Sequence, residues 1–207
     1  MILMVPVKGY FEENSYLYID DDSKHGFLID PGAEADRLLQ IIDHYQFVIE
    51  KILLTHGHFD HTGAVREISE KLNIPVYAHE RAGEYLNDAY NNLSALCGPA
   101  ITVEDWYPVK DAEVISLKDN PSFSLRVIYT PGHTTDSVIF YSQNDHAAFV
   151  GDTIFKGSIG NDRYPGGNGK QLISSIVSRI FTLPVDTVLY SGHSERTTVQ
   201  EERARYI

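Results

Sequence analysis

The sequence of 207 residues contains almost no cysteine and has no long apolar run. Its single cysteine, Cys97, excludes an internal disulfide bond and is typical of proteins in a reducing compartment. No apolar run approaches the roughly 18 residues that a membrane-spanning helix needs. No basic segment precedes the short apolar stretch at the start of the chain, so we expect no signal peptide. These absences favour a cytoplasmic protein with no membrane partner.

Positive charge is also scarce. The chain has 17 Lys and Arg residues against 29 Asp and Glu residues, and its formal net charge is −12 at pH 7 with histidine neutral. A field of this sign repels the phosphate backbone of nucleic acids, so we expect no nucleic-acid partner. Such a field would attract metal cations, although an excess of acidic residues is usually spread over a solvated surface.

The order of the apolar patterns predicts an α/β fold in a single domain over residues 1–207. Apolar residues at helical spacing predict helices near 38–45, 64–72 and 172–181, whereas 80–107 has no clean period and is interpreted as helix plus loop. No linker-like stretch and no repeat divides the chain. Short apolar runs bounded by turn residues predict strands at 1–7, 16–19, 27–29, 51–55, 75–78, 112–117, 124–129, 137–141, 147–150 and 186–190.

Several of these predicted strands run into glycine next to histidine or aspartate. The segments concerned read LLTHGH, IYTPGH, FVGD and LYSGH. Glycine lets the backbone turn sharply where a strand ends, and α/β folds place their sites at such ends. We therefore expect these strand ends to deliver metal-type ligands to one rim of the fold. The side chains that follow the strands are His56, His58, His133, Asp152 and His193.

The densest group of such residues is THGHFDH at 55–61. By composition alone, an HxHxDH pattern would arise in about one of a thousand such chains. Its spacing differs from the HExxH helix motif, so we expect the side chains to alternate in a tight loop. His56 and His58 could then face one metal while Asp60 and His61 face another. Imidazole and carboxylate ligands suit Zn²⁺, Fe²⁺ or Mn²⁺.

Further motifs extend this pattern over most of the chain: LIDPG at 28–32, TPGH at 130–133, GDTIFKGSIG at 151–160, YPGG at 164–167 and SGH at 191–193. With these motifs the chain resembles the metallo-β-lactamase-fold hydrolases, and within them the glyoxalase II-like (hydroxyacylglutathione hydrolase-like) branch. The resemblance implies a four-layer αβ/βα sandwich with metals at one edge. It also implies a ligand set of His56, His58 and His133 for one metal, Asp60, His61 and His193 for a second, and Asp152 as a bridge.

The activity implied by this resemblance is hydrolysis of a small-molecule thioester, such as S-lactoylglutathione or a related small acyl substrate, by a metal-bridging hydroxide. Two divalent cations acidify a shared water near neutral pH and polarise the substrate carbonyl. Asp60, which would orient the hydroxide, and Asp152 would be the catalytic carboxylates. Zinc is the favoured metal, with iron or manganese also compatible. The absence of a nucleophile motif such as GxSxG agrees with this chemistry.

The chain departs from that branch where the substrate would bind. Asn161 stands where lysine or arginine commonly follows the glycine of GSIG, and only residues 194–207 follow the last expected ligand. This remainder is too short for the helical extension that binds glutathione in long members of the branch. Arg163 is therefore our candidate for the positively charged side chain that binds the anionic end of the substrate, and Lys170 is a second candidate. We also expect 80–107 to form one wall of the substrate pocket.

Other activities stay open. A mononuclear-iron persulfide dioxygenase would use His56, His133 and Asp152, which occur in both patterns. A hydrolase of another ester or a phosphoester would share the whole ligand set. A true β-lactamase is disfavoured because the zinc forms generally lack the bridging aspartate that Asp152 would supply. The oligomeric state stays open.

Overall fold

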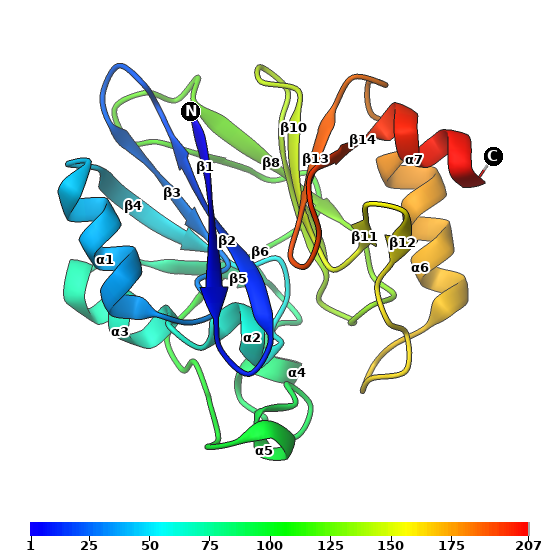
Figure 1. Ribbon diagram of the computed structural model, residues 1–207, viewed down its shortest axis with the longest axis horizontal. Coiled ribbons are helices and arrows are strands. Elements are labelled where there is room, and N and C mark those ends of the chain that lie inside the picture. Colours follow the sequence, from blue (N-terminus) through cyan, green and yellow to red (C-terminus); the bar gives the residue numbers. More distant parts are fainter. Residues whose placement is uncertain (207) are drawn as a thin grey trace.

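The computed structural model describes residues 1–206 and contains two six-stranded sheets that face each other (Figure 1). The strands of the first sheet are, in spatial order, β1 (Ile2–Lys8), β2 (Glu12–Ile19), β3 (His25–Ile29), β4 (Val48–Leu53), β5 (Val76–His79) and β6 (Tyr107–Val109). Those of the second are β14 (Thr197–Thr198), β13 (Val188–Ser191), β10 (Ala147–Gly151), β9 (Val138–Ser142), β8 (Ser124–Tyr129) and β7 (Val114–Ser116). A separate hairpin pairs β11 (Ile154–Phe155) with β12 (Ser158–Ile159).

Helices cover the outer face of each sheet (Figure 1). The first sheet is covered by α1 (Ala35–His44) and α3 (Val65–Leu72). The second is covered by α6 (Gly169–Ser175), its π-helical continuation η1 (Ile176–Ile180) and α7 (Val199–Tyr206). Three short helices, α2 (Phe59–Thr62), α4 (Gly83–Leu86) and α5 (Ser94–Cys97), lie at one end of the molecule. The four layers confirm the expected αβ/βα sandwich.

The alternation of side chains along the central strands builds three core layers. Successive residues of a strand point to opposite faces of the sheet. In β2, Leu17 and Ile19 pack toward α1 and α3, whereas Tyr16 and Tyr18 pack between the sheets. In β10, Phe149 packs between the sheets and its neighbours pack toward the helices of the second sheet. Such strands are apolar on both faces, which is why they read as continuous apolar runs.

Parallel pairing brings strand ends to one edge of the sandwich. In the first sheet β3, β4, β5 and β6 pair in parallel, and in the second sheet β10 pairs in parallel with β13. The remaining pairs of the two sheets are antiparallel. Parallel strands present their carboxyl ends at the same edge, and binding sites of α/β folds lie there.

Some elements differ from the sequence-based expectation. The tight loop expected at 55–61 contains the helical turn α2, in which the His61 N–H donates to the carbonyl of His58 (3.1 Å). Four short strands were not predicted: β6, β11, β12 and β14. Each has only two or three residues, which is too short for a periodic pattern in the sequence. Helix α7 was not predicted either, because only Val199 and Glu202 of it are buried. Among the described residues, none of the helices combines the length and the apolar character needed to cross a membrane.

Candidate metal centre

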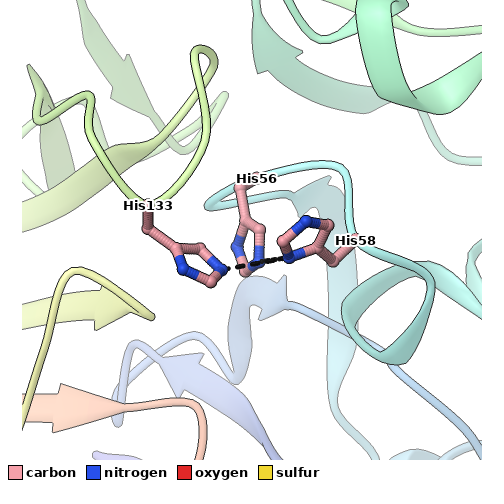
Figure 2. A group of neighbouring side chains, drawn as sticks. All are labelled: His56, His58 and His133. Atoms are coloured by element: carbon pink, nitrogen blue, oxygen red, sulfur yellow. Dashed lines mark hydrogen bonds between the residues drawn. The ribbon is translucent and has the colours of Figure 1, made fainter. Parts of the chain in front are cut away.

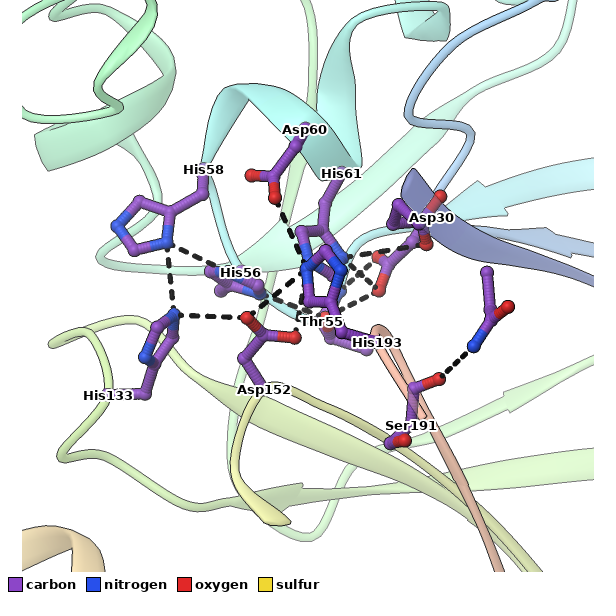
Figure 3. A network of polar contacts seen from close by, with 12 residues as sticks. Asp30, Thr55, His56, His58, Asp60, His61, His133, Asp152, Ser191 and His193 are labelled. Atoms are coloured by element: carbon purple, nitrogen blue, oxygen red, sulfur yellow. Dashed lines mark hydrogen bonds and ion pairs between the residues drawn. The ribbon is translucent and has the colours of Figure 1, made fainter. Parts of the chain in front are cut away.

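The expected ligands meet where strands of both sheets end (Figure 3). His56 and His58 follow β4, and His133 follows β8. Asp152 follows β10, and His193 follows β13. Asp60 and His61 lie on α2, which begins at the residue after His58. The structure therefore brings together every residue that the sequence analysis singled out as a metal ligand.

Three buried histidines form what we call the histidine cluster: His56, His58 and His133 (Figure 2). Nδ1 of His58 lies 3.1 Å from Nε2 of His56 and 3.0 Å from Nε2 of His133. Each residue is only 2% exposed. Burial lowers the pKa of His56 and of His133, and it lowers the pKa of His58 to about 3. The three imidazoles are therefore neutral at neutral pH.

In two of these histidines, a hydrogen bond at Nδ1 fixes which ring nitrogen carries the proton. Nδ1 of His133 donates to the carbonyl oxygen of Asn161 at 2.8 Å. Nδ1 of His56 lies 3.1 Å from the Thr55 hydroxyl, which donates its own proton to Asp30 Oδ2 at 2.6 Å. The Nε2 atoms of His56 and His133 therefore carry lone pairs toward His58. Three converging nitrogens with at most one proton among them form a donor set for a cation.

A second group, which we call the mixed cluster, consists of Asp60, His61 and His193. Nδ1 of His193 donates to the carbonyl oxygen of Glu12 at 2.7 Å, so in the neutral ring Nε2 carries the lone pair. That Nε2 lies 3.2 Å from Asp60 Oδ2, which is itself an acceptor. On the other side of the cluster, Nδ1 of His61 lies 3.1 Å from Asp30 Oδ2.

Asp152 lies between the two clusters (Figure 3). Its Oδ2 lies 3.6 Å from His133 Nε2 and 3.5 Å from His193 Nε2, and its Oδ1 lies 3.4 Å from His61 Nε2. Burial opposes the charge of Asp152, but His61 and the other histidines outweigh it and hold its pKa well below the usual range. Burial likewise opposes the charge of His61, yet Asp152 and Asp30 raise the pKa of His61 well above its usual value. One carboxylate thus serves both clusters.

The donor atoms fit divalent cations. Ligands 2.0–2.2 Å from a tetrahedral metal lie about 3.3–3.6 Å from one another, close to the separations found between these side chains. Among the described residues, the buried atoms His61 Nε2 and Asp152 Oδ1 have no hydrogen-bond partner. Buried polar atoms without a partner are costly, and a cation between them would remove that cost. Imidazole and carboxylate donors are compatible with zinc, iron or manganese.

Two supporting acids were missed as site residues by the sequence analysis. Asp30, in the LIDPG motif, is buried at a positive φ of 47° and accepts from the Thr55 backbone N–H at 2.8 Å as well as from its hydroxyl. Glu13 is 1% exposed with Oε1 3.7 Å from His61 Nδ1, and burial raises its pKa well above the usual value. An acid directly after an apolar strand is a signal that could have identified Asp30. Glu13 lies among other polar residues in sequence and carries no such signal.

The segment 80–107 lies near one residue of each cluster. The Tyr85 ring meets the His58 ring edge-on at 5.9 Å between centroids, and the Tyr85 hydroxyl donates to the Pro165 carbonyl at 3.1 Å. Cys97 lines a cavity that Asp60 also lines. Part of this segment therefore borders the metal centre, as the sequence analysis expected of a pocket wall.

Arg163 lies in an open hollow beside the histidine cluster. Its backbone N–H donates to Asn161 Oδ1 at 3.0 Å, and the carbonyl of Asn161 holds His133. The hollow has a volume of about 800 Å³ and is also lined by Lys170. Within residues 1–206, no ion pair engages the exposed side chain of Arg163. The guanidinium is thus free to meet an anion.

Known proteins share both the sequence pattern and the fold. A family model described as "Metallo-beta-lactamase superfamily" matches residues 9–193. The probable metallo-hydrolase YqgX of Bacillus subtilis is 37% identical over 198 residues, which cover 94% of this chain and 91% of that protein. The hydroxyacylglutathione hydrolase GloC of Haemophilus influenzae is 30% identical over 206 residues, which cover 98% of this chain and 94% of that protein.

Solved structures match over nearly the full length. The BLEG-1 B3 metallo-beta-lactamase is 33% identical and superposes with a TM-score of 0.92, covering 99% of this chain and 97% of that one. TTHA1623 in a di-iron-bound form is 32% identical with a TM-score of 0.83, covering 97% and 96% of the two chains.

Proposed function

The chain belongs to the metallo-beta-lactamase superfamily, and we propose that it is a metal-dependent hydrolase of a small-molecule thioester. In this proposal the histidine cluster would hold one divalent cation and the mixed cluster a second, with Asp152 as a ligand available to both. The observation that carries the proposal is the position of Asp152, whose carboxylate lies within 3.4–3.6 Å of ring nitrogens from both clusters. A carboxylate within reach of both clusters could serve two metal ions at once.

When bound, the cations would acidify a water molecule and polarise the thioester carbonyl. In the reaction, the oxygen of water adds to the carbonyl carbon, the C–S bond breaks, and the departing thiolate takes up a proton. Asp60 is the carboxylate that we assign to orienting the water and accepting its proton. His193 Nε2 lies 3.2 Å from Asp60 Oδ2, so both atoms face the position of the same cation. The main-chain carbonyl of Glu12 in turn orients His193 through Nδ1.

We assign the anionic, thiol-bearing part of the substrate to the hollow that contains Arg163. An arginine without an ion pair beside a metal ligand can bind a carboxylate of a glutathione-type thiol. The 30% identity with a hydroxyacylglutathione hydrolase supports S-lactoylglutathione, or a related acyl thioester, as the substrate class. The net charge of −12 supports a small-molecule substrate over nucleic acid. The single cysteine supports a cytoplasmic location.

Metal analysis of protein purified without added metal, followed by a thioester panel on the same sample, tests this proposal. We expect close to two metal ions per chain, with zinc favoured, and hydrolysis that a chelator abolishes. About one iron per chain with oxidation of a persulfide, and no thioester hydrolysis, would instead establish the dioxygenase alternative. Hydrolysis of carboxylic esters or phosphoesters alone would replace the thioester assignment and keep the metal centre.

A second candidate activity is β-lactam hydrolysis, because BLEG-1, a B3 metallo-beta-lactamase, superposes with a TM-score of 0.92. Both reactions break an acyl bond at a metal-polarised carbonyl, so the histidine ligands could serve either reaction. A nitrocefin assay on the same metal-loaded sample separates the two. We expect kcat/KM for nitrocefin to be at least about 100-fold lower than for the best thioester, since Asp152 disfavours the β-lactamase assignment.

A further inference from the structure

A cavity beside the mixed cluster, which shares no lining residue with the hollow that contains Arg163, is not used by the function proposed above. We call it the aromatic pocket; it has a volume of about 470 Å³, within the range of small-molecule sites. Its walls come from segments far apart in the chain: the β1–β2 turn, the start of α1, helix α2 with the start of α3, and residues 94–101 around α5. The β1–β2 turn, α2 and α5 lie at the same end of the molecule (Figure 1).

Three aromatic rings line this pocket. Tyr10 and Phe11, in the β1–β2 turn, meet edge-on with their centroids 5.0 Å apart. Both rings contact Phe59 of α2, at 6.2 and 6.0 Å between centroids. Tyr10 is 65% exposed and Phe11 is 42% exposed, whereas Phe59 is buried. Exposed aromatic rings gathered over a cavity are typical of a surface that binds an apolar group.

The charges of the aromatic pocket select against an anion. Glu34, Asp60 and Glu67 line it, and no lysine or arginine is among its lining residues. The other contributors include small apolar side chains such as Ala33, Ala64 and Pro99. A carboxylate or phosphate placed here would meet like charge without a compensating cation. The occupant that fits is therefore apolar and uncharged.

The two hollows lie next to different metal clusters. Asp60 of the mixed cluster lines the aromatic pocket. Asn161, whose carbonyl holds His133 of the histidine cluster, lines the cationic hollow with Arg163 and Lys170. A thioester whose carbonyl lies at Asp152 thus has an apolar surface near one cluster and a cationic surface near the other.

We propose that the aromatic pocket binds the acyl group of the substrate, and that this group is bulky, apolar and uncharged, of the size of phenylacetyl rather than acetyl. Of the acyl thioesters proposed above, the pocket therefore favours one with a larger acyl group than S-lactoylglutathione. This inference rests on the proposed hydrolase function and specifies its substrate class. The thiol part of the substrate carries the negative charge and lies toward Arg163. The Tyr10, Phe11 and Phe59 rings then select the acyl group by its apolar area.

Thioesters of N-acetylcysteamine test the acyl preference, because the thiol part stays constant and neutral. We expect kcat/KM for the phenylacetyl thioester to exceed that for the acetyl thioester by at least about 10-fold. In a Tyr10→Ala/Phe11→Ala variant this ratio should fall at least about 5-fold. Tyr45→Ala removes an exposed aromatic side chain outside the pocket and should leave the ratio unchanged. A wild-type ratio near one, or a ratio that the double variant leaves unchanged, overturns the proposal.

Filling the pocket provides a second variant. A Cβ built on Gly98 has no atom within 4 Å, and Gly98 lines the pocket, so Gly98→Trp adds bulk at the edge of the pocket without a clash at Cβ. We expect this variant to lower the phenylacetyl-to-acetyl ratio at least about 5-fold. A ratio that stays at the wild-type value in Gly98→Trp counts against the proposal even if the double variant behaves as expected.

Protection of Cys97 gives a readout that needs no catalysis. Cys97 is partly exposed and lines the aromatic pocket, so an occupant should slow its alkylation by iodoacetamide. The probe is the thioether analogue of the phenylacetyl substrate, in which CH₂ replaces the carbonyl. We expect at least about 5-fold slower alkylation in the wild type and no slowing in Tyr10→Ala/Phe11→Ala. If no thioester is hydrolysed, the proposed function fails, and protection or its absence still decides whether the pocket binds the apolar group.

Discussion

The two clusters on either side of Asp152 are built differently. The histidine cluster contains three buried neutral imidazoles, whose pKa values burial lowers. The mixed cluster contains the carboxylate of Asp60 and two histidines, His61 and His193, whose pKa values the surrounding carboxylates raise in spite of burial. Because metal ligands must be deprotonated, a proton competes with the metal at the mixed cluster far more than at the histidine cluster.

In one site burial lowers the pKa values of the histidines, whereas in the neighbouring site nearby carboxylates raise them. The side chain of His193 is 24% exposed, whereas those of His133 and His61 are 2% and 0% exposed. We expect the histidine cluster to keep its metal more firmly and the mixed cluster to exchange its metal with solvent more readily. Asp152 links the two, so its removal should affect both.

Asp152→Ala is the substitution with the largest expected effect, because it removes the carboxylate that the two clusters share. Without that carboxylate two bound cations would be poorly compensated, so we expect loss of at least one metal per chain. Turnover should fall by about 100-fold or more, given the share of the barrier that metals supply. Metal content by mass spectrometry and kcat on the same sample check this. A variant with two metals and wild-type turnover would refute the bridging role.

Asp30→Asn should weaken metal binding more at the mixed cluster than at the histidine cluster. Asp30 Oδ2 contacts His61 Nδ1 at 3.1 Å and also accepts from the Thr55 hydroxyl behind His56. Loss of such an orienting carboxylate lowers metal affinity by about 10–100-fold, and we expect the mixed cluster to be affected more strongly because its contact is direct. Competition with a chelator measures the two affinities. Asp36→Asn, on the exposed first turn of α1, is the matched control, and equal losses at both clusters would contradict the predicted asymmetry.

Asp136→Asn tests the charge state of a buried acid next to the histidine cluster. Asp136 is fully buried, and its Oδ2 would lie 3.3 Å from a Cβ on Gly57, between His56 and His58. Burial raises the pKa of Asp136 to about 7, against about 3.9 in an unfolded chain. Between these values the folded protein holds a proton that the unfolded chain releases, so stability falls as pH rises.

The amide does not titrate and avoids this loss. We expect Asp136→Asn to increase the free energy of unfolding by about 1–3 kcal/mol at pH 8, with the gain shrinking toward pH 4. Urea denaturation of both proteins at the two pH values, with metal content held equal, measures it. A gain that does not depend on pH would show that Asp136 is already ionised in the folded protein.

Arg163→Ala has the smallest expected effect and probes the hollow beside the histidine cluster. Since Arg163 would bind a substrate carboxylate equally in the ground and transition states, its loss should raise KM for a glutathione thioester by about 3–10-fold and change kcat little. A neutral N-acetylcysteamine thioester should be almost unaffected. Equal effects on charged and neutral substrates would make Arg163 a structural residue and remove the local support for a glutathione-type thiol.

The main strands and helices could be predicted from the sequence because their apolar periods are long. The repeats at Leu38–Tyr45 and Leu172–Phe181 fall on α1 and on α6 with η1. The two-residue strands β11, β12 and β14 could not be predicted, because their residues form strands only where a neighbouring backbone pairs with them. Glu13 could not be recognised either, because its burial depends on the packing of β2 against α2 and not on its neighbours in sequence.

The sequence by itself determined the fold class and the candidate ligands, since apolar alternation and glycine next to histidine at strand ends are local patterns. The division of these ligands into two sets and the bridging place of Asp152 were implied by the family resemblance. Only the tertiary structure decided which nitrogen of a histidine ring is free to bind a metal. It also decided that the pKa of His58 falls while that of His61 rises. The physical reason is that ring orientation and charge balance depend on backbone carbonyls and carboxylates brought together from distant strands, and neither burial nor these contacts is encoded in the spacing of the motif.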